Sequence, residues 1–230
     1  MTETERQRTF KDYYKNNQGI FYKKFSTDIN NIHYDYDIYW GEPEIIFDQY
    51  TLLHTFPLAV SIIPQFKNWP NSRIYLHEKL TQENKNIFEM IIAHEIGHFF
   101  LHDVVGVTRP SALNFMDENT AEIWADYFSY SFFLKYRNLQ KIEGFYSIME
   151  EACNLQYRIY NLNPEEHKEL AYTQKVHKLQ TLKDTIIKGM ENNLSLYLQM
   201  EKAIEIMLMA LGDIFEEKTL TESSHEVIIR

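Results

Sequence analysis

A proline-free stretch, residues 82–102, most constrains what this chain can fold into. Its apolar side chains fall on nearly every face of a helical projection, and its only glycine is Gly97. A helix that is apolar all round is covered by other elements rather than lying on a surface. We therefore expect a buried central helix here, followed by a loop over residues 103–117 and a second helix over residues 118–134.

The central helix carries two histidines and a glutamate within the segment His94-Glu95-Ile96-Gly97-His98. Residues four apart lie on one face of a helix about one turn apart, so both imidazoles can reach one metal ion. Glu95 can address a metal-bound water from the side, and two nitrogen ligands with a general base are what a zinc hydrolase requires. Polar groups in so apolar a helix are costly unless they coordinate a metal or form hydrogen bonds. A pair of hydrogen-bonded histidines without a metal is therefore the alternative.

The second predicted helix offers a third metal ligand. Glu122 lies 24 residues after His98, far enough for a loop and a helical return, and it would leave a fourth coordination position open to water. Asp126, one turn further on, can accept the free N–H of a ligand histidine and fix its tautomer. Two alternatives stay open: Glu122 as the capping partner of Asn119, and Asp126 as a surface charge.

Taken together, these residues form a longer and more specific motif. The run His94-Glu95-Ile96-Gly97-His98-Phe99-Phe100-Leu101-His102, followed by Glu122-x-x-Ala125-Asp126-x-Phe128, resembles the ImmA/IrrE family of intracellular zinc metallopeptidases and, more broadly, the gluzincins. The resemblance covers residues 70–135. Two positions depart from the family pattern: Ser129 stands where Ala is usual, and the segment 132–135 lacks the Pro that is common there.

The resemblance implies that His94, His98 and Glu122 bind Zn²⁺ and that Glu95 is the catalytic base. It also implies that an extended protein substrate pairs with the strand near residues 73–77, as the edge of the sheet, and that this substrate is a transcriptional repressor with a helix-turn-helix domain. We therefore expect a zinc-dependent intracellular endopeptidase. Its main rival is a non-catalytic, zinc-containing regulator that binds a protein partner through its C-terminal helices.

The expected fold is α+β, with a zincin-like metallopeptidase core over residues 1–137 and a helical C-terminal region over residues 138–230. The core would combine a small sheet with the active-site helices, because five of the six prolines precede residue 111 and prolines mark turns and sheet connections. Segments 44–53 and 58–63 fit either a strand or a short helix. The other predicted elements are a helix over 5–17, strands over 32–40 and 73–77, and helices over 140–160, 164–188 and 192–216.

Composition excludes several classes of protein. The net charge of −10 disfavours a broad basic surface, so we expect no direct binding to nucleic acid. The single cysteine, Cys153, excludes an internal disulfide and a cysteine-based zinc ribbon, and we expect it to be buried. No secretory signal and no run of about 18 apolar residues occurs. We therefore expect a cytoplasmic protein without a membrane partner.

Other histidines and tyrosines near the motif receive structural roles. His102 lies about 12 Å from His94 along the helix axis, at about 1.5 Å per residue, so packing is favoured over a third-ligand role. The remaining candidates are assigned by their predicted element: Tyr75 and His77 to solvent-facing strand positions, Tyr127 and Tyr130 to the core.

Overall fold

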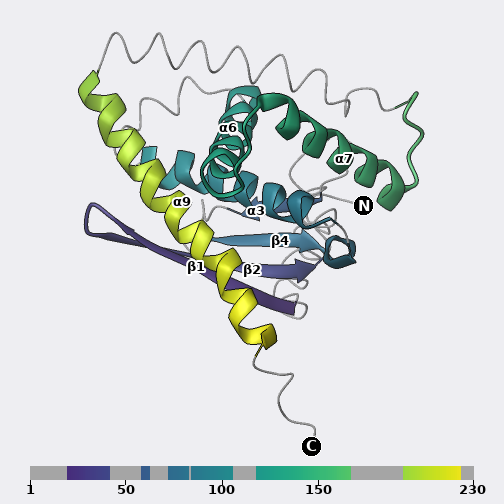
Figure 1. Ribbon diagram of the computed structural model, residues 1–230, viewed down its shortest axis with the longest axis horizontal. Helices are drawn as coiled ribbons and strands as arrows, with labels where there is room; N and C mark the ends of the chain where they lie inside the picture. Colours follow the sequence, from purple (N-terminus) through teal and green to yellow (C-terminus); the bar gives the residue numbers. More distant parts are fainter. Residues whose placement is uncertain are drawn as a thin grey trace, which may run out of the picture.

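A mixed four-stranded sheet and four α-helices make up the described part of the chain in the computed structural model (Figure 1). The structure describes residues 20–41, 58–62, 72–82, 84–105, 118–166 and 194–223. The described residues are α+β, as the sequence predicts. In chain order the elements are β1 (Ile20–Ile29), β2 (Ile32–Gly41), β3 (Ala59–Ile62), β4 (Arg73–His77), the 3₁₀-helix η1 (Glu78–Gln82), α3 (Lys85–Phe99), the π-helix η2 (Phe100–Val105), α6 (Glu118–Tyr136), α7 (Ile142–Tyr160) and α9 (Leu194–Ser223).

The first two strands form a long hairpin, of which the sequence analysis predicts only the second strand. Asn30 and Asn31 form the turn, with φ values of 53° and 64°, and Ile29 pairs with Ile32 across it. Asparagine tolerates positive φ, which is why a two-residue hairpin turn suits this pair. The signal in the sequence that predicts this hairpin is therefore the Asn-Asn pair between the two strands.

The strand order corrects one prediction about the sheet. The order is β1-β2-β4-β3, with β4 parallel to β2 on one side and antiparallel to β3 on the other. The strand at residues 73–77 is therefore an inner strand and not the sheet edge. All five of its residues are buried, as expected for a strand with a neighbour on each side. Among the described strands, the edge next to it is β3, which lies within the segment 58–63 whose structure the pattern left undecided.

The helices confirm most of the predicted positions, although the last helix continues to Ser223, beyond its predicted end at residue 216. The central helix begins after Asn84, whose side-chain Oδ1 accepts a hydrogen bond from the Asn86 amide at 2.8 Å, and it passes into the π-helix at Phe100. The helices predicted over 118–134, 140–160 and 192–216 correspond to α6, α7 and α9. The helix predicted over 5–17 and the segment 44–53 lie outside the described residues. So does the helix predicted over 164–188, apart from its first three positions.

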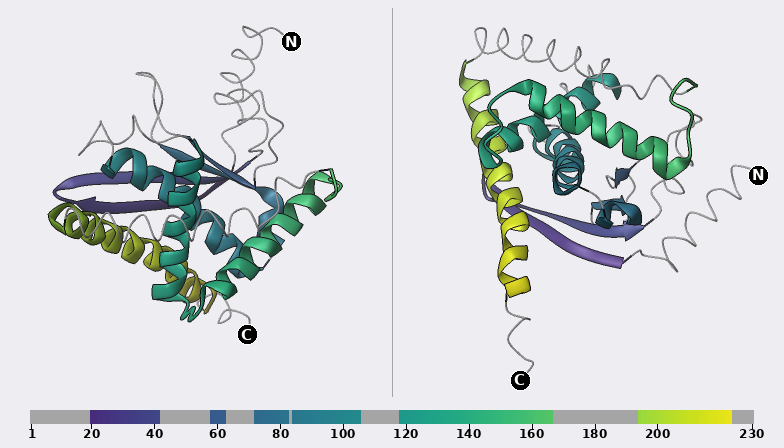
Figure 2. Two further views of the ribbon diagram at one scale, coloured as in Figure 1. Left: turned by 90° about the horizontal axis from the view of Figure 1, so that it is seen from above. Right: turned by 45° about the vertical axis from the view of Figure 1, so that its right-hand side comes forward.

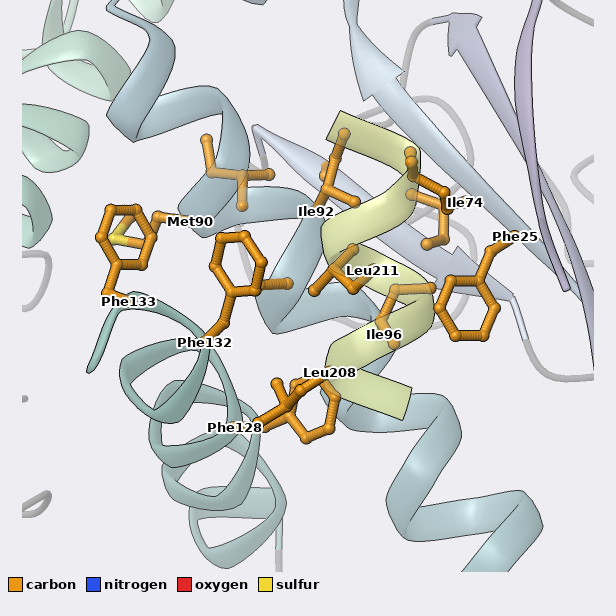
Figure 3. Close-up of a cluster of buried hydrophobic side chains, with 14 of the residues drawn as sticks. Phe25, Ile74, Met90, Ile92, Ile96, Phe128, Phe132, Phe133, Leu208 and Leu211 are labelled. Carbon is orange, nitrogen blue, oxygen red and sulfur yellow. The ribbon is translucent and has the colours of Figure 1, made fainter. Parts of the chain in front are cut away.

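One hydrophobic cluster joins the sheet to all four α-helices. Figure 3 shows Phe25 and Ile74 of the sheet, Ile92 and Ile96 of α3, and the phenylalanines of α6 converging with Leu208 and Leu211 of α9. Helix α9 packs against both β1 and α6, and it lies across the hairpin strands in Figures 1 and 2. Residues on both sides of position 137 therefore share this core. The division into regions 1–137 and 138–230 stays a prediction. In the part of the chain described here, no helix combines the length and apolar character needed to cross a bilayer.

Candidate active site

The close approach of α3 and α6 positions the candidate site. A Cβ added at Gly97 would lie 2.8 Å from the Cα of Ala125 and 3.1 Å from the Cβ of Phe128. Only glycine fits at position 97, and a small residue at 125 keeps the partner backbone within reach. This contact explains why both positions belong to the sequence motif, because it brings one turn of α6 against the two histidines of α3.

At this crossing the structure brings together the three residues that the sequence analysis assigns to the metal. The Nε2 atoms of His94 and His98 lie 3.1 Å apart. The two carboxylate oxygens of Glu122 lie 3.2 Å from Nε2 of His94 and 3.3 Å from Nε2 of His98. One ligand atom from each residue lies within 4.8 Å of the others. Two imidazole nitrogens and a carboxylate oxygen converging in this way can hold a metal ion.

Asp126 lies where the sequence analysis predicts a residue that orients a ligand. Its Oδ1 is 2.8 Å from Nδ1 of His94, so Nδ1 carries the proton that it donates to the carboxylate. In the neutral ring, the lone pair of the other nitrogen, Nε2, then faces the cluster. The capping role of Glu122 fits less well, because α6 already begins at Glu118 and Asn119 lies inside the helix rather than at its N-cap. Asp126 is 14 % exposed and contacts His94, so it is not a free surface charge.

The electrostatics of the cluster favour a positive charge at its centre. Burial opposes protonation of His94, but the carboxylates of Asp126 and Glu122 outweigh it and hold the pKa of His94 well above its usual value. For Glu122, the partial loss of hydration beside the histidines favours the neutral acid, whereas hydrogen bonds from His94 and His98 outweigh this effect and lower its pKa. A bound cation would occupy the place of the proton that these groups share. The residues present therefore fit a divalent metal.

Solvent reaches the cluster from the side of Glu122. The side chain of Glu122 is 54 % exposed, whereas those of His94 and His98 are 18 % and 17 % exposed. The cluster is therefore accessible to solvent at Glu122. Glu95 follows His94 on α3, as its position in the motif requires, and is buried.

The other candidates divide between confirmed and corrected assignments. Tyr130 packs on Phe145 and Cys153 is buried, both as predicted. Tyr75 and His77 do not face solvent, because β4 is an inner strand, and they are 1 % and 8 % exposed. Among the described residues, the group that could hold a metal does not include His102. Its Nδ1 lies 2.9 Å from Oδ1 of Asp103.

Two features of the helix packing were missed by the sequence analysis. The buried hydroxyl of Ser129, which departs from the family pattern, donates to the carbonyl of Met90 on α3 at 3.0 Å. Glu89, fully buried on α3, accepts two hydrogen bonds from the guanidinium of Arg137, at 2.5 and 2.9 Å. A glutamate within an apolar helix was the available signal, since a buried carboxylate needs a partner. Both contacts hold α6 against α3.

Comparison with known proteins agrees with the motif. Residues 50–159 match the family model of the IrrE N-terminal-like domain, a peptidase family. The matched segment contains β3, β4, α3 and α6, and therefore all the residues of the cluster. No curated protein and no solved structure matches the chain. The predicted resemblance to the ImmA/IrrE family is confirmed, and it extends beyond the segment 70–135.

Proposed function

We propose that this chain, a metallopeptidase of the ImmA/IrrE family through its IrrE N-terminal-like domain at residues 50–159, is a zinc-dependent endopeptidase that cleaves a peptide bond within a protein substrate. The observation that carries the proposal is the convergence of His94, His98 and Glu122 on one point. Asp126 behind His94 supports it, because a carboxylate that orients a histidine is usual next to a metal ligand.

The donor set favours zinc among the common metals. Two neutral imidazoles and one carboxylate, with one position left open, form the ligand set of catalytic zinc sites in hydrolases. A structural zinc site would instead be closed by a fourth protein ligand. When bound, such a metal supplies Lewis acidity to a water molecule and to the peptide carbonyl.

The chain itself supplies the proton transfers. Glu95 would accept a proton from the attacking water and deliver it to the nitrogen of the departing amine, so that one carboxylate serves both steps. His94 would stay in the tautomer set by Asp126 throughout, with Nδ1–H donating to the carboxylate. The catalytic group and the orienting group are therefore different carboxylates on different helices.

The strand order moves the expected substrate contact from β4 to β3. An extended peptide can add to a sheet only at an edge, where backbone donors and acceptors are available. β3 is the edge strand next to β4, and it also packs against α3, which carries His94 and His98. We propose that the substrate pairs with β3, and that a repressor with a helix-turn-helix domain remains the first substrate to test.

The rival hypothesis of a non-catalytic regulator gains less support. It requires the C-terminal helices to offer a binding surface, but α9 uses Leu208, Leu211 and Phe215 in the core of the metallopeptidase domain itself. The exposure of Glu122 also leaves the candidate site open, which a purely structural site does not need.

The proposal is tested by mapping new protein N-termini in cells that express the wild-type chain or Glu95→Gln. We expect a small set of cleavage products that depends on Glu95. The matched control is Glu205→Gln, a surface glutamate on α9 paired with Lys135, which should give the wild-type products. If Glu95→Gln yields the same products as the wild type, the proposed proton transfer is wrong.

A further inference from the structure

Along α3 and the π-helix, solvent exposure continues past the candidate metal ligands to His102. From Glu89 to Leu101 every residue is buried except His94 and His98, and the next accessible residue is His102. The side chain of His102 is 37 % exposed, about twice as much as those of the two histidines before it. Between Glu89 and His102, solvent therefore reaches the helix only at three histidines, each four residues from the next; Asp103, which follows, is 21 % exposed.

The π-helix keeps His102 on the face of the two candidate ligands. In an α-helix four residues exceed one turn of about 3.6 residues, so positions four apart drift around the axis. A π-turn contains more residues, which offsets this drift between His98 and His102. Along the axis the two histidines are separated by about 6 Å, the length of roughly two residues of an extended peptide.

A chain of hydrogen bonds from the core fixes the ring of His102. Its Nδ1 lies 2.9 Å from Oδ1 of Asp103, and the other carboxylate oxygen accepts a hydrogen bond from the Tyr36 hydroxyl at 2.9 Å. Tyr36 is buried in β2 and stacks between Phe25 and Phe99. Because an ionised carboxylate only accepts, Nδ1 of His102 must donate, and Nε2 of the neutral ring is then an acceptor. Within the described residues, Nε2 has no hydrogen-bond partner.

We propose that His102 is a substrate-contacting residue, whose Nε2 accepts a hydrogen bond from an N–H of the bound peptide about two residues from the scissile bond. The proposal rests on the proposed function, since it places the peptide along the face that contains the metal ligands. It goes beyond the packing role that the sequence suggests for this histidine. Asp103 and Tyr36 are positioning residues, because they act on the substrate only through the ring of His102.

The contact between His102 and the substrate can be tested by measuring how three hydroxamates bind to the zinc-loaded full chain. A hydroxamate group binds zinc through its two oxygen atoms. Acetohydroxamate reaches only the metal, whereas two tripeptide hydroxamates extend from it, one toward the amino side and one toward the carboxyl side. His102→Phe keeps an aromatic ring but loses the acceptor. We expect it to weaken one of the two peptide hydroxamates about three- to tenfold, the effect of one hydrogen bond, and to leave acetohydroxamate unchanged.

Two further variants separate contact from structure. His102→Gln places an amide oxygen near the position of Nε2 and should recover part of the lost affinity. His33→Phe is the matched control, because His33 is also a partly exposed histidine whose Nδ1 contacts an aspartate, Asp28, at 2.8 Å. It should change none of the three affinities.

The outcomes distinguish this inference from the proposed function. If acetohydroxamate binds and His102→Phe changes all three affinities equally, or none of them, the substrate contact is wrong and the metal site stands. If acetohydroxamate does not bind the zinc-loaded wild type, the metallopeptidase proposal is overturned, and the role of His102 with it. A fall in melting temperature without a change in the ratio of the affinities would assign His102 to structure alone.

Discussion

At the scale of single residues, Asp126 decides which nitrogen of His94 is available to a metal. The 2.8 Å contact with Nδ1 fixes both the tautomer and the orientation of the ring. We expect Asp126→Ala to lower zinc affinity about 10- to 100-fold, the usual effect of losing a carboxylate that supports a metal ligand. Competition with a chromogenic chelator measures this affinity. Asp213→Ala, an exposed position on α9, is the control, and equal affinities in both variants would rule out the orienting role.

The hairpin contains a histidine whose titration can be followed independently of the site. The hydrogen bond to Asp28 and the nearby charge of Asp35 raise the pKa of His33 above its usual value. A raised pKa in the folded state stabilises the hairpin below the unfolded pKa of about 6.5, and this contribution is lost as the pH rises through the folded pKa. NMR titration should give a raised pKa that falls toward 6.5 in Asp28→Asn. An unchanged pKa in that variant would contradict the assignment to Asp28.

The candidate ligands could be placed from the sequence because a helix fixes which residues share a face. His94 and His98 are four residues apart, and so are Glu122 and Asp126. The two residues of each pair therefore share a face as soon as their helix forms. The burial of Tyr75 and His77 could not be predicted in the same way. It depends on which strands flank β4, and strand order is not a local property of the sequence.

At the scale of elements, the contact between Gly97 and Ala125 sets the distance between the two site helices. Gly97→Ala would put a methyl group 2.8 Å from a backbone carbon, so α6 must shift and move Glu122 away from the histidines. We expect destabilisation of about 1–3 kcal/mol, as for other overpacked sites, together with weaker zinc binding. Chemical denaturation and chelator competition measure the two effects.

Gly144→Ala in α7 provides the matched control for that substitution. The added methyl group would also meet a neighbour at 2.8 Å, but this neighbour is a terminal carbon of the Leu139 side chain, which can move. Alanine also favours a helix over glycine by up to about 1 kcal/mol. We therefore expect unchanged zinc binding in this variant. A loss of zinc binding in both variants would show that the close approach of α3 and α6 is not its cause.

The elements themselves were predicted unevenly. Long helices were found because their apolar pattern extends over several turns, whereas β1 was missed because the signal is a short alternation beside an Asn-Asn turn. The family resemblance implied that β4 is the edge strand, whereas the edge next to it is β3, which has only four residues. Which strands pair depends on contacts between residues distant in the sequence. The residue pattern within one segment carries no information about these contacts.

At the scale of the whole molecule, the C-terminal helix completes the core that supports the site. Ala203, Met207, Leu208 and Leu211 of α9 belong to the same cluster as Ile92 and Ile96 of α3. The side chain of Lys23 on β1 donates to the carbonyl of Ile214 at 2.5 Å, a further contact between the hairpin and α9. The sequence indicated that this region is helical but not that it packs here, because the same apolar stripe suits a bundle core, a partner surface or this sheet.

The metal content of the purified protein tests most directly whether His94, His98 and Glu122 form a zinc site. We expect about one zinc per chain in the wild type and in Glu95→Gln, because Glu95 is assigned to proton transfer and not to the metal. Glu122→Ala should retain far less zinc after dialysis against a weak chelator, since two imidazoles alone would hold the ion. Full zinc occupancy in Glu122→Ala, or no zinc in a wild type reconstituted with the metal, would contradict the site formed by His94, His98 and Glu122.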